Sequence, residues 1–163
     1  MQLNVAGKRC HVGTGGKPFD PACSPYPPLL LVHGAANDRD CWRRVAGGLS
    51  AAGCALLVPD LPGHGLSAGP ALRSVEELAD WLPALLDAVG VERAVLVGHS
   101  MGSLVTLECA ARHPQRVSQL ALLGTSAPMP VADALLSRAT THPDSVVRMM
   151  TEYSHTLQFL LTG

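Results

Sequence analysis

The stretch Ala94–Leu104, AVLVGHSMGSL, places an apolar run directly before a serine that lies between two glycines. The run Val95–Val97 is short and wholly apolar, which is typical of a strand buried on both faces. Residues Met101–Arg112 then have the spacing of an amphipathic helix. Between them, GHSMG at 98–102 matches the pattern GxSxG, in which a sharp strand-to-helix turn lifts the serine above a sheet. The stretch therefore predicts an exposed serine beside the free amides of a helix N-terminus.

Further apolar runs alternate with helical patterns on both sides of this stretch. We expect strands at Leu29–Val32, Ala55–Val58 and Val117–Leu123, after a hairpin formed by Gln2–Val5 and Arg9–Val12. We expect helices over 38–52 and from Ser74 toward Gly90, with Ser74 and Glu77 forming a capping box. Apolar strands separated by helices predict an α/β fold: a doubly wound, mostly parallel sheet with helices on both faces.

Composition excludes several classes of partner. The chain has 163 residues, 47% of them hydrophobic and 15% charged, and a formal net charge of −1, so nothing attracts it to nucleic acid or an anionic membrane. No uninterrupted apolar run approaches the roughly 20 residues that span a bilayer, and the first ten residues contain no apolar leader, so we expect a cytoplasmic protein. The five cysteines are odd in number and widely spaced, which favours free thiols over a disulfide framework or a zinc site.

Polar residues follow the other predicted strands as well. In an open parallel sheet, the loops after the strands' carboxyl ends surround one crevice. After Leu29–Val32 comes His33-Gly34-Ala35, a turn whose backbone can approach Ser100. The Ala35 and Met101 amides would then form an oxyanion hole, in which each donor contributes roughly 10²–10³ in rate. The glycine-rich loop Asp60–Ser67 is expected to shape the crevice rather than to react.

With HG at 33–34, DLPGHGLS at 60–67 and GHSMG at 98–102, the sequence resembles the α/β-hydrolase fold family. Within it, the chain resembles the small bacterial serine esterases and carbon–carbon bond hydrolases that carry a helical cap. The resemblance implies that Ser100 is the nucleophile and that the amides of Ala35 and Met101 hold the oxyanion. Because serine rather than aspartate stands at the turn, it disfavours epoxide hydrolases and haloalkane dehalogenases.

The resemblance also divides the chain. It implies that residues 1–126 are the N-terminal part of the hydrolase core and that residues 127–163 begin the helical cap. In this second part the periodicity predicts short helices at 131–139 and 145–150, with no strand between them.

The other members of a catalytic triad are missing from the expected places. In this fold the order is Ser, then Asp or Glu, then His. The carboxylates and histidines after Leu123 follow no strand end; they are Asp133, Asp144, Glu152, His142 and His155. Three earlier histidines lie near the crevice, but no carboxylate is evident to orient them; they are His33, His64 and His99. We expect His33 and His99 to hydrogen-bond the backbone and His64 to be a loop residue. We therefore expect a truncated chain that lacks the C-terminal strands, the triad acid and the histidine, and that is nearly inactive alone.

These observations predict a serine hydrolase that acts on a small carboxylic ester or related acyl substrate. No metal, nucleotide or prosthetic group is implied, and the only partner implied is the small acyl substrate. Two alternatives remain open: a carbon–carbon bond hydrolase, and a non-catalytic ligand-binding module of the same fold. A plainer interpretation of Ser100 is an ordinary helix N-cap, since serine is favoured there in any case.

Overall fold

The computed structural model describes residues 1–142 and 144–149. Within them, six strands form one sheet in the order β1-β2-β4-β3-β5-β6. The strands are β1 (Gln2–Val5), β2 (Lys8–Gly13), β3 (Leu29–Val32), β4 (Leu56–Pro59), β5 (Ala94–His99) and β6 (Val117–Leu123). The α-helices are α1 (Arg43–Ala51), α2 (Val75–Ala88), α3 (Met101–Arg112) and α4 (Asp133–Thr141). Short 3₁₀ turns occur at Pro21–Cys23, Arg39–Trp42 and Pro114–Arg116.

The sheet is mixed but mostly parallel. Strands β3, β4, β5 and β6 run parallel to one another, whereas β1 and β2 form an antiparallel hairpin that joins β4 through β2. The register pairs Val32 with Gly98 and His99 with Leu123. The carboxyl ends of β3, β4 and β5 therefore meet at one edge of the sheet, as the prediction of an α/β fold requires.

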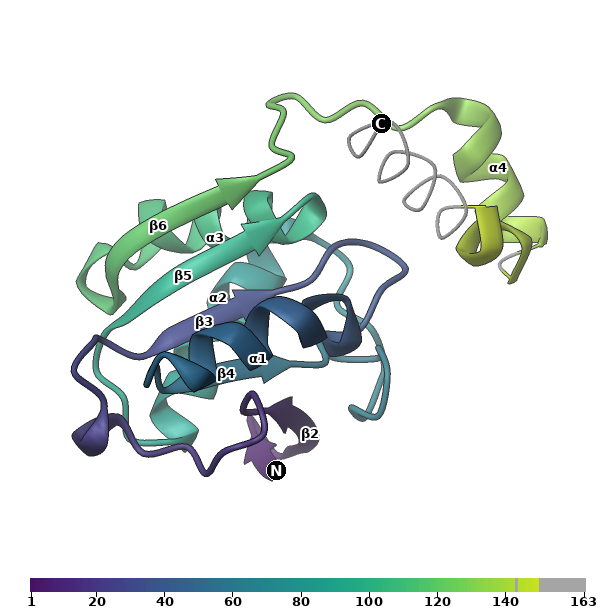
Figure 1. Ribbon diagram of the computed structural model, residues 1–163. Coiled ribbons are helices and arrows are strands. Elements are labelled where there is room, and N and C mark those ends of the chain that lie inside the picture. Colours follow the sequence, from purple (N-terminus) through teal and green to yellow (C-terminus); the bar gives the residue numbers. More distant parts are fainter. Residues whose placement is uncertain (143, 150–163) are drawn as a thin grey trace, which may run out of the picture. The chain divides into compact units, whose positions relative to one another are not determined.

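Helices cover both faces of this sheet. Helix α1 lies on one face, and α2 and α3 lie on the other (Figure 1). Side chains of β3 alternate between the two: Leu30 and Val32 pack with the residues of α2 and α3, whereas Leu31 packs with Trp42 and Ala46. Both faces are buried, which explains why the strand is apolar at every position rather than at every second one.

The predicted elements are confirmed, with small differences at their ends. The helix expected over 38–52 begins as the 3₁₀ turn Arg39–Trp42, with the Asp40 N–H donating to Asp38 Oδ1 at 2.8 Å, and becomes α-helical only at Arg43. Strand β5 is longer than the predicted Val95–Val97 and extends to the residue before Ser100.

The N-terminus of α2 also differs from the predicted capping box. The Glu77 N–H donates to Ser74 Oγ at 3.1 Å, as expected of a capping serine. The Glu77 carboxylate, however, accepts from the Arg73 N–H at 2.7 Å rather than from the Ser74 amide. The carboxylate of Glu77 therefore bonds to the amide one residue before the one that a capping box uses.

The chain divides into two compact units, Met1–Ala127 and Pro128–Gly163. In the second unit, α4 and a helical stretch at 144–149 stand where helices were predicted at 131–139 and 145–150; Met150 lies outside the described residues. That residues 127–163 begin a cap stays a prediction. No helix in the described part of the chain is both long enough and apolar enough to cross a membrane.

Candidate active site

Ser100 has a strained backbone. It joins β5 to α3 with φ 54° and ψ −124°, a conformation that residues other than glycine rarely adopt. Its N–H donates to the Leu123 carbonyl at 2.9 Å, and its own carbonyl accepts from the Ser103 N–H at 2.8 Å and from Ser103 Oγ at 2.6 Å. Contacts on both sides therefore hold the turn in this conformation, which strained residues need in order to persist.

The two glycines of the motif allow β5 and α3 to approach closely. A Cβ at Gly98 would lie 2.3 Å from the Gly102 carbonyl oxygen, and a Cβ at Gly102 would lie 2.4 Å from the Val32 carbonyl oxygen. Neither position has room for a side chain, because both obstacles are backbone atoms. The helix N-terminus is therefore packed directly against the end of β3.

The turn after β3 lies beside the serine. A Cβ at Gly34 would meet Ser100 Cβ at 3.1 Å and the His99 carbonyl oxygen at 3.2 Å. Ala35 follows on this turn, and Met101 is the first residue of α3, where an amide has no partner within the helix. The structure thus brings the three positions into one small region. That the two amides aim at a common oxyanion stays a prediction.

His33 is a structural residue of the turn. It is fully buried; its Nε2 accepts from the Leu61 N–H at 3.1 Å, so the proton of the neutral ring is on Nδ1, which donates to the Gly34 carbonyl at 2.8 Å. Burial lowers the pKa of His33, which favours this neutral form. Both ring nitrogens are occupied by the backbone, so His33 cannot act as the base for Ser100.

His64 and His99 have different surroundings. His64 Nδ1 contacts the Pro62 carbonyl at 3.0 Å, and its ring lies 5.1 Å from that of His33. His99 is exposed, and its ring and that of Trp42 form a T-shaped pair with 6.4 Å between the centroids. Among residues 1–127, no histidine or carboxylate is hydrogen-bonded to the Ser100 hydroxyl.

The candidate acids and bases of the second unit are described within that unit alone. Asp133 is the first residue of α4, and His142 Nδ1 contacts Thr141 Oγ1 at 3.0 Å. Asp144 lies in the helical stretch at 144–149. Glu152 and His155 lie outside the described residues.

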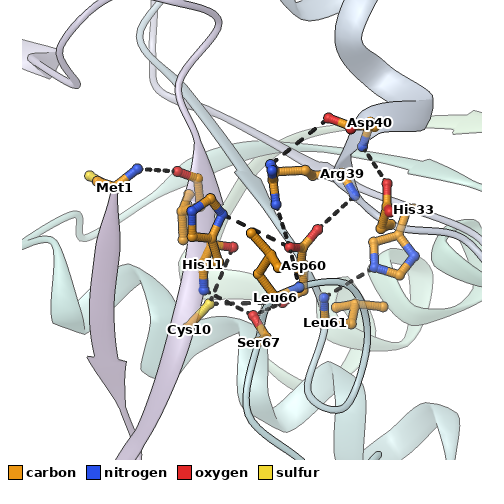
Figure 2. A network of polar contacts seen from close by, with 12 residues as sticks. Met1, Cys10, His11, His33, Arg39, Asp40, Asp60, Leu61, Leu66 and Ser67 are labelled. Atoms are coloured by element: carbon orange, nitrogen blue, oxygen red, sulfur yellow. Dashed lines mark hydrogen bonds and ion pairs between the residues drawn. The ribbon is translucent and has the colours of Figure 1, made fainter.

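Sequence reasoning missed a buried ionic contact next to the site. Asp60, expected only to begin a loop that shapes the crevice, is fully buried and bonded to Arg39 (Figure 2). One signal was available: an aspartate directly after a wholly apolar strand is a charge entering the protein interior, and such a charge requires a partner.

Comparison with known proteins gives a consistent result. Residues 27–152 match the family model of the alpha/beta hydrolase fold. One relative is the dihydrolipoyllysine-residue acetyltransferase component of the acetoin cleaving system of Pseudomonas putida, 42% identical over 61% of this chain and 27% of that protein. Another is the pimeloyl-[acyl-carrier protein] methyl ester esterase of Aromatoleum aromaticum, 39% identical over 61% of this chain and 38% of the esterase.

Among solved structures, Epoxide Hydrolase A from Mycobacterium thermoresistibile superimposes with a TM-score of 0.68 at 29% identity, covering 86% of this chain and 43% of the other. The chain therefore spans less than half the length of each of these three proteins.

Proposed function

Since this chain belongs to the alpha/beta hydrolase fold family, we propose that the protein is a serine hydrolase that cleaves a small carboxylic ester or a related acyl substrate. One observation supports this most strongly: Ser100 has a strained backbone at the carboxyl end of β5, with the Gly34 turn in contact with it. An ordinary N-cap serine has an extended backbone and a side chain bonded to a helix amide, and Ser100 has neither.

The proposed chemistry is acyl transfer through Ser100. Its Oγ attacks the carbonyl carbon and passes its proton to a histidine base, while the amides of Ala35 and Met101 stabilise the negative oxygen of the tetrahedral intermediate. Collapse of the intermediate releases the alcohol, which takes that proton, and leaves an acyl-serine that water then hydrolyses. We place the histidine and its carboxylate outside the described residues, because in this fold the acid and then the histidine follow the serine along the chain, and no described strand follows β6.

We place the protein in a reducing compartment, the cytoplasm. All five cysteines are free thiols, two of them buried. Disulfides are rare where glutathione and thioredoxin keep thiols reduced, so unpaired cysteines fit a cytoplasmic protein.

A fluorophosphonate probe tests the proposal on the complete natural protein. We expect the probe to label the wild-type protein and Ser100→Ala to abolish the labelling and lower ester turnover by about 10⁴-fold or more, because no second nucleophile replaces the serine. Ser137→Ala, which alters an exposed serine of α4, is the matched control. It should keep both the labelling and the ester turnover.

Within residues 1–127 no histidine or carboxylate is hydrogen-bonded to Ser100, and this favours a second candidate, a ligand-binding module of the same fold. It would bind a small acyl compound without being labelled. A protein that is labelled but prefers vinylogous diketones to p-nitrophenyl esters would instead be a carbon–carbon bond hydrolase.

A further inference from the structure

Asp60 is a buried charge that the proposed chemistry does not use. It follows β4 and has no exposed surface. A carboxylate that has lost its water is costly unless several donors replace it.

Donors from two loops surround this carboxylate (Figure 2). Oδ1 accepts from the Arg39 N–H at 2.9 Å, and Oδ2 accepts from Arg39 Nη1 at 2.5 Å and from the Leu66 N–H at 2.9 Å. Gly65 lies directly over the group, since a Cβ there would be 2.5 Å from Asp60 Cγ. One side chain thus joins the loop after β3 to the loop after β4.

Other charged groups nearby do not replace Arg39. His11 Nδ1 lies 3.9 Å from Asp60 Oδ2, but its pKa is lowered by burial and by Arg39, which favours the uncharged ring. Asp40 is a second carboxylate, 4.0 Å from Arg39 Nε, and it adds no positive charge. The guanidinium of Arg39 is therefore the main counter-charge of Asp60.

These bonds hold both ends of the turn that carries Ala35. The turn from Gly34 to Asp38 is anchored before it by His33, which accepts from the Leu61 N–H, and after it by Arg39, which is held by Asp60. Between the anchors Ala36 has φ 55°, a strained value for a residue with a side chain. A strained turn keeps its shape only while both of its ends are held.

We propose that Asp60 is a positioning residue that acts through Arg39 to hold the Ala35 amide where the oxyanion forms. This inference rests on the proposed function, because it assigns Asp60 a part in that reaction. Asp60 touches no reacting atom. Its carboxylate fixes the second end of the turn, so its loss affects catalysis by misplacing a donor.

The test compares Asp60→Asn with Asp80→Asn in the complete natural protein. The amide introduced by Asp60→Asn would direct an NH₂ group toward donors that need an acceptor. Asp80 is a matched control, because it also accepts two bonds from one arginine, Arg112, but lies on the surface between α2 and α3.

Two readouts separate positioning from a merely structural role. In Asp60→Asn we expect the Arg39 amide at the end of the turn, which donates to Asp60 in the wild type, to exchange hydrogen at least about tenfold faster. We expect kcat to fall by about 10- to 100-fold with KM within about twofold, since an oxyanion donor acts on the transition state. Asp80→Asn should change neither. Arg39→Lys should recover much of the kcat that Arg39→Met loses. If Asp60→Asn does not fold, this pair of variants tests the proposal in its place, and equal kcat values in the two would contradict it.

The proposal is overturned if the turn exchanges as in wild type in a folded Asp60→Asn protein, or if it loosens while kcat is unchanged. If the wild-type protein neither hydrolyses esters nor takes the fluorophosphonate probe, the proposed function has failed. Hydrogen exchange would still decide whether Asp60 holds the turn, so the two failures are distinguishable.

Discussion

Ser100 and Ala36 are non-glycine residues with positive φ, and they lie on the two turns that meet at the candidate site. Each such backbone costs about 1–3 kcal/mol and persists only where its surroundings hold it. Bonds from Ser103 hold the first turn, and His33 and Arg39 hold the second at its ends. The stability of the site therefore depends on polar groups that are buried, as Ser103 and His33 are, or half-buried, as Arg39 is.

Acid is expected to destabilise the fold at His33. Burial lowers its pKa below the ordinary value of 6.5, and protonation would remove the lone pair that accepts from the Leu61 N–H. The unfolded chain then binds a proton that the folded protein does not. The stabilisation from His33 is complete above about pH 6.5 and is lost as the pH falls toward the lowered pKa, by up to about 1.4 kcal/mol per pH unit. Urea denaturation between about pH 8 and pH 5 measures the change.

Variants assign this pH dependence to its source. His33→Gln removes the titrating group and should flatten the profile of the free energy of unfolding. His11→Gln should flatten it separately, because the pKa of His11 is also lowered, by burial first and then by Arg39. His142→Gln alters an exposed histidine of the second unit and serves as the control. A profile as steep in His33→Gln as in wild type would contradict this account.

At the scale of single residues, the sequence predicted the features that depend on neighbouring residues in the chain. The glycines around Ser100 and the backbone bonds of His33 follow from a motif of five residues and a turn of three. The bond between Arg39 and Asp60 could not be predicted, because it joins residues 21 positions apart whose loops meet only in the folded sheet. His99, expected to bond to the backbone, instead contacts Trp42.

At the scale of elements, the strands were predicted almost to the residue because their apolar runs are bounded by glycine, proline or charge. The start of α1 was less accurate. The stretch Arg39–Trp42 has bonds three residues apart rather than four, and the apolar spacing of so short a segment does not distinguish a 3₁₀ turn from an α-helix. The packing of one element against another is tested by substitution.

The contact between β5 and α3 should not tolerate a methyl group. Gly98→Ala would place Cβ 2.3 Å from a carbonyl of α3, so the two elements must separate, and we expect the free energy of unfolding to fall by about 1–3 kcal/mol or more. Gly47→Ala is the matched control within α1. Nothing lies within 4 Å of its Cβ, and alanine there should stabilise the protein by about 0.5–1 kcal/mol. Urea denaturation compares them, and a neutral Gly98→Ala would contradict the close packing.

At the scale of the whole molecule, the alternation of strands and helices predicted the parallel part of the sheet and its two helical layers. It did not predict that the N-terminal hairpin joins the sheet through β2 and β4, because strand pairing over 45 or more residues is determined by tertiary contacts. This order places β4 beside β3 and so brings the loop of Asp60 to the turn that carries Ala35.

In the proposed mechanism Ser100 faces two backbone donors, one on the turn after β3 and one at the start of α3. The most direct measurement is a crystal structure of the complete protein after reaction with a fluorophosphonate. We expect phosphorus bonded to Ser100 Oγ, with the phosphonyl oxygen within about 2.7–3.1 Å of the amide nitrogens of both Ala35 and Met101. An adduct on another residue, or an oxygen directed away from both amides, would contradict it.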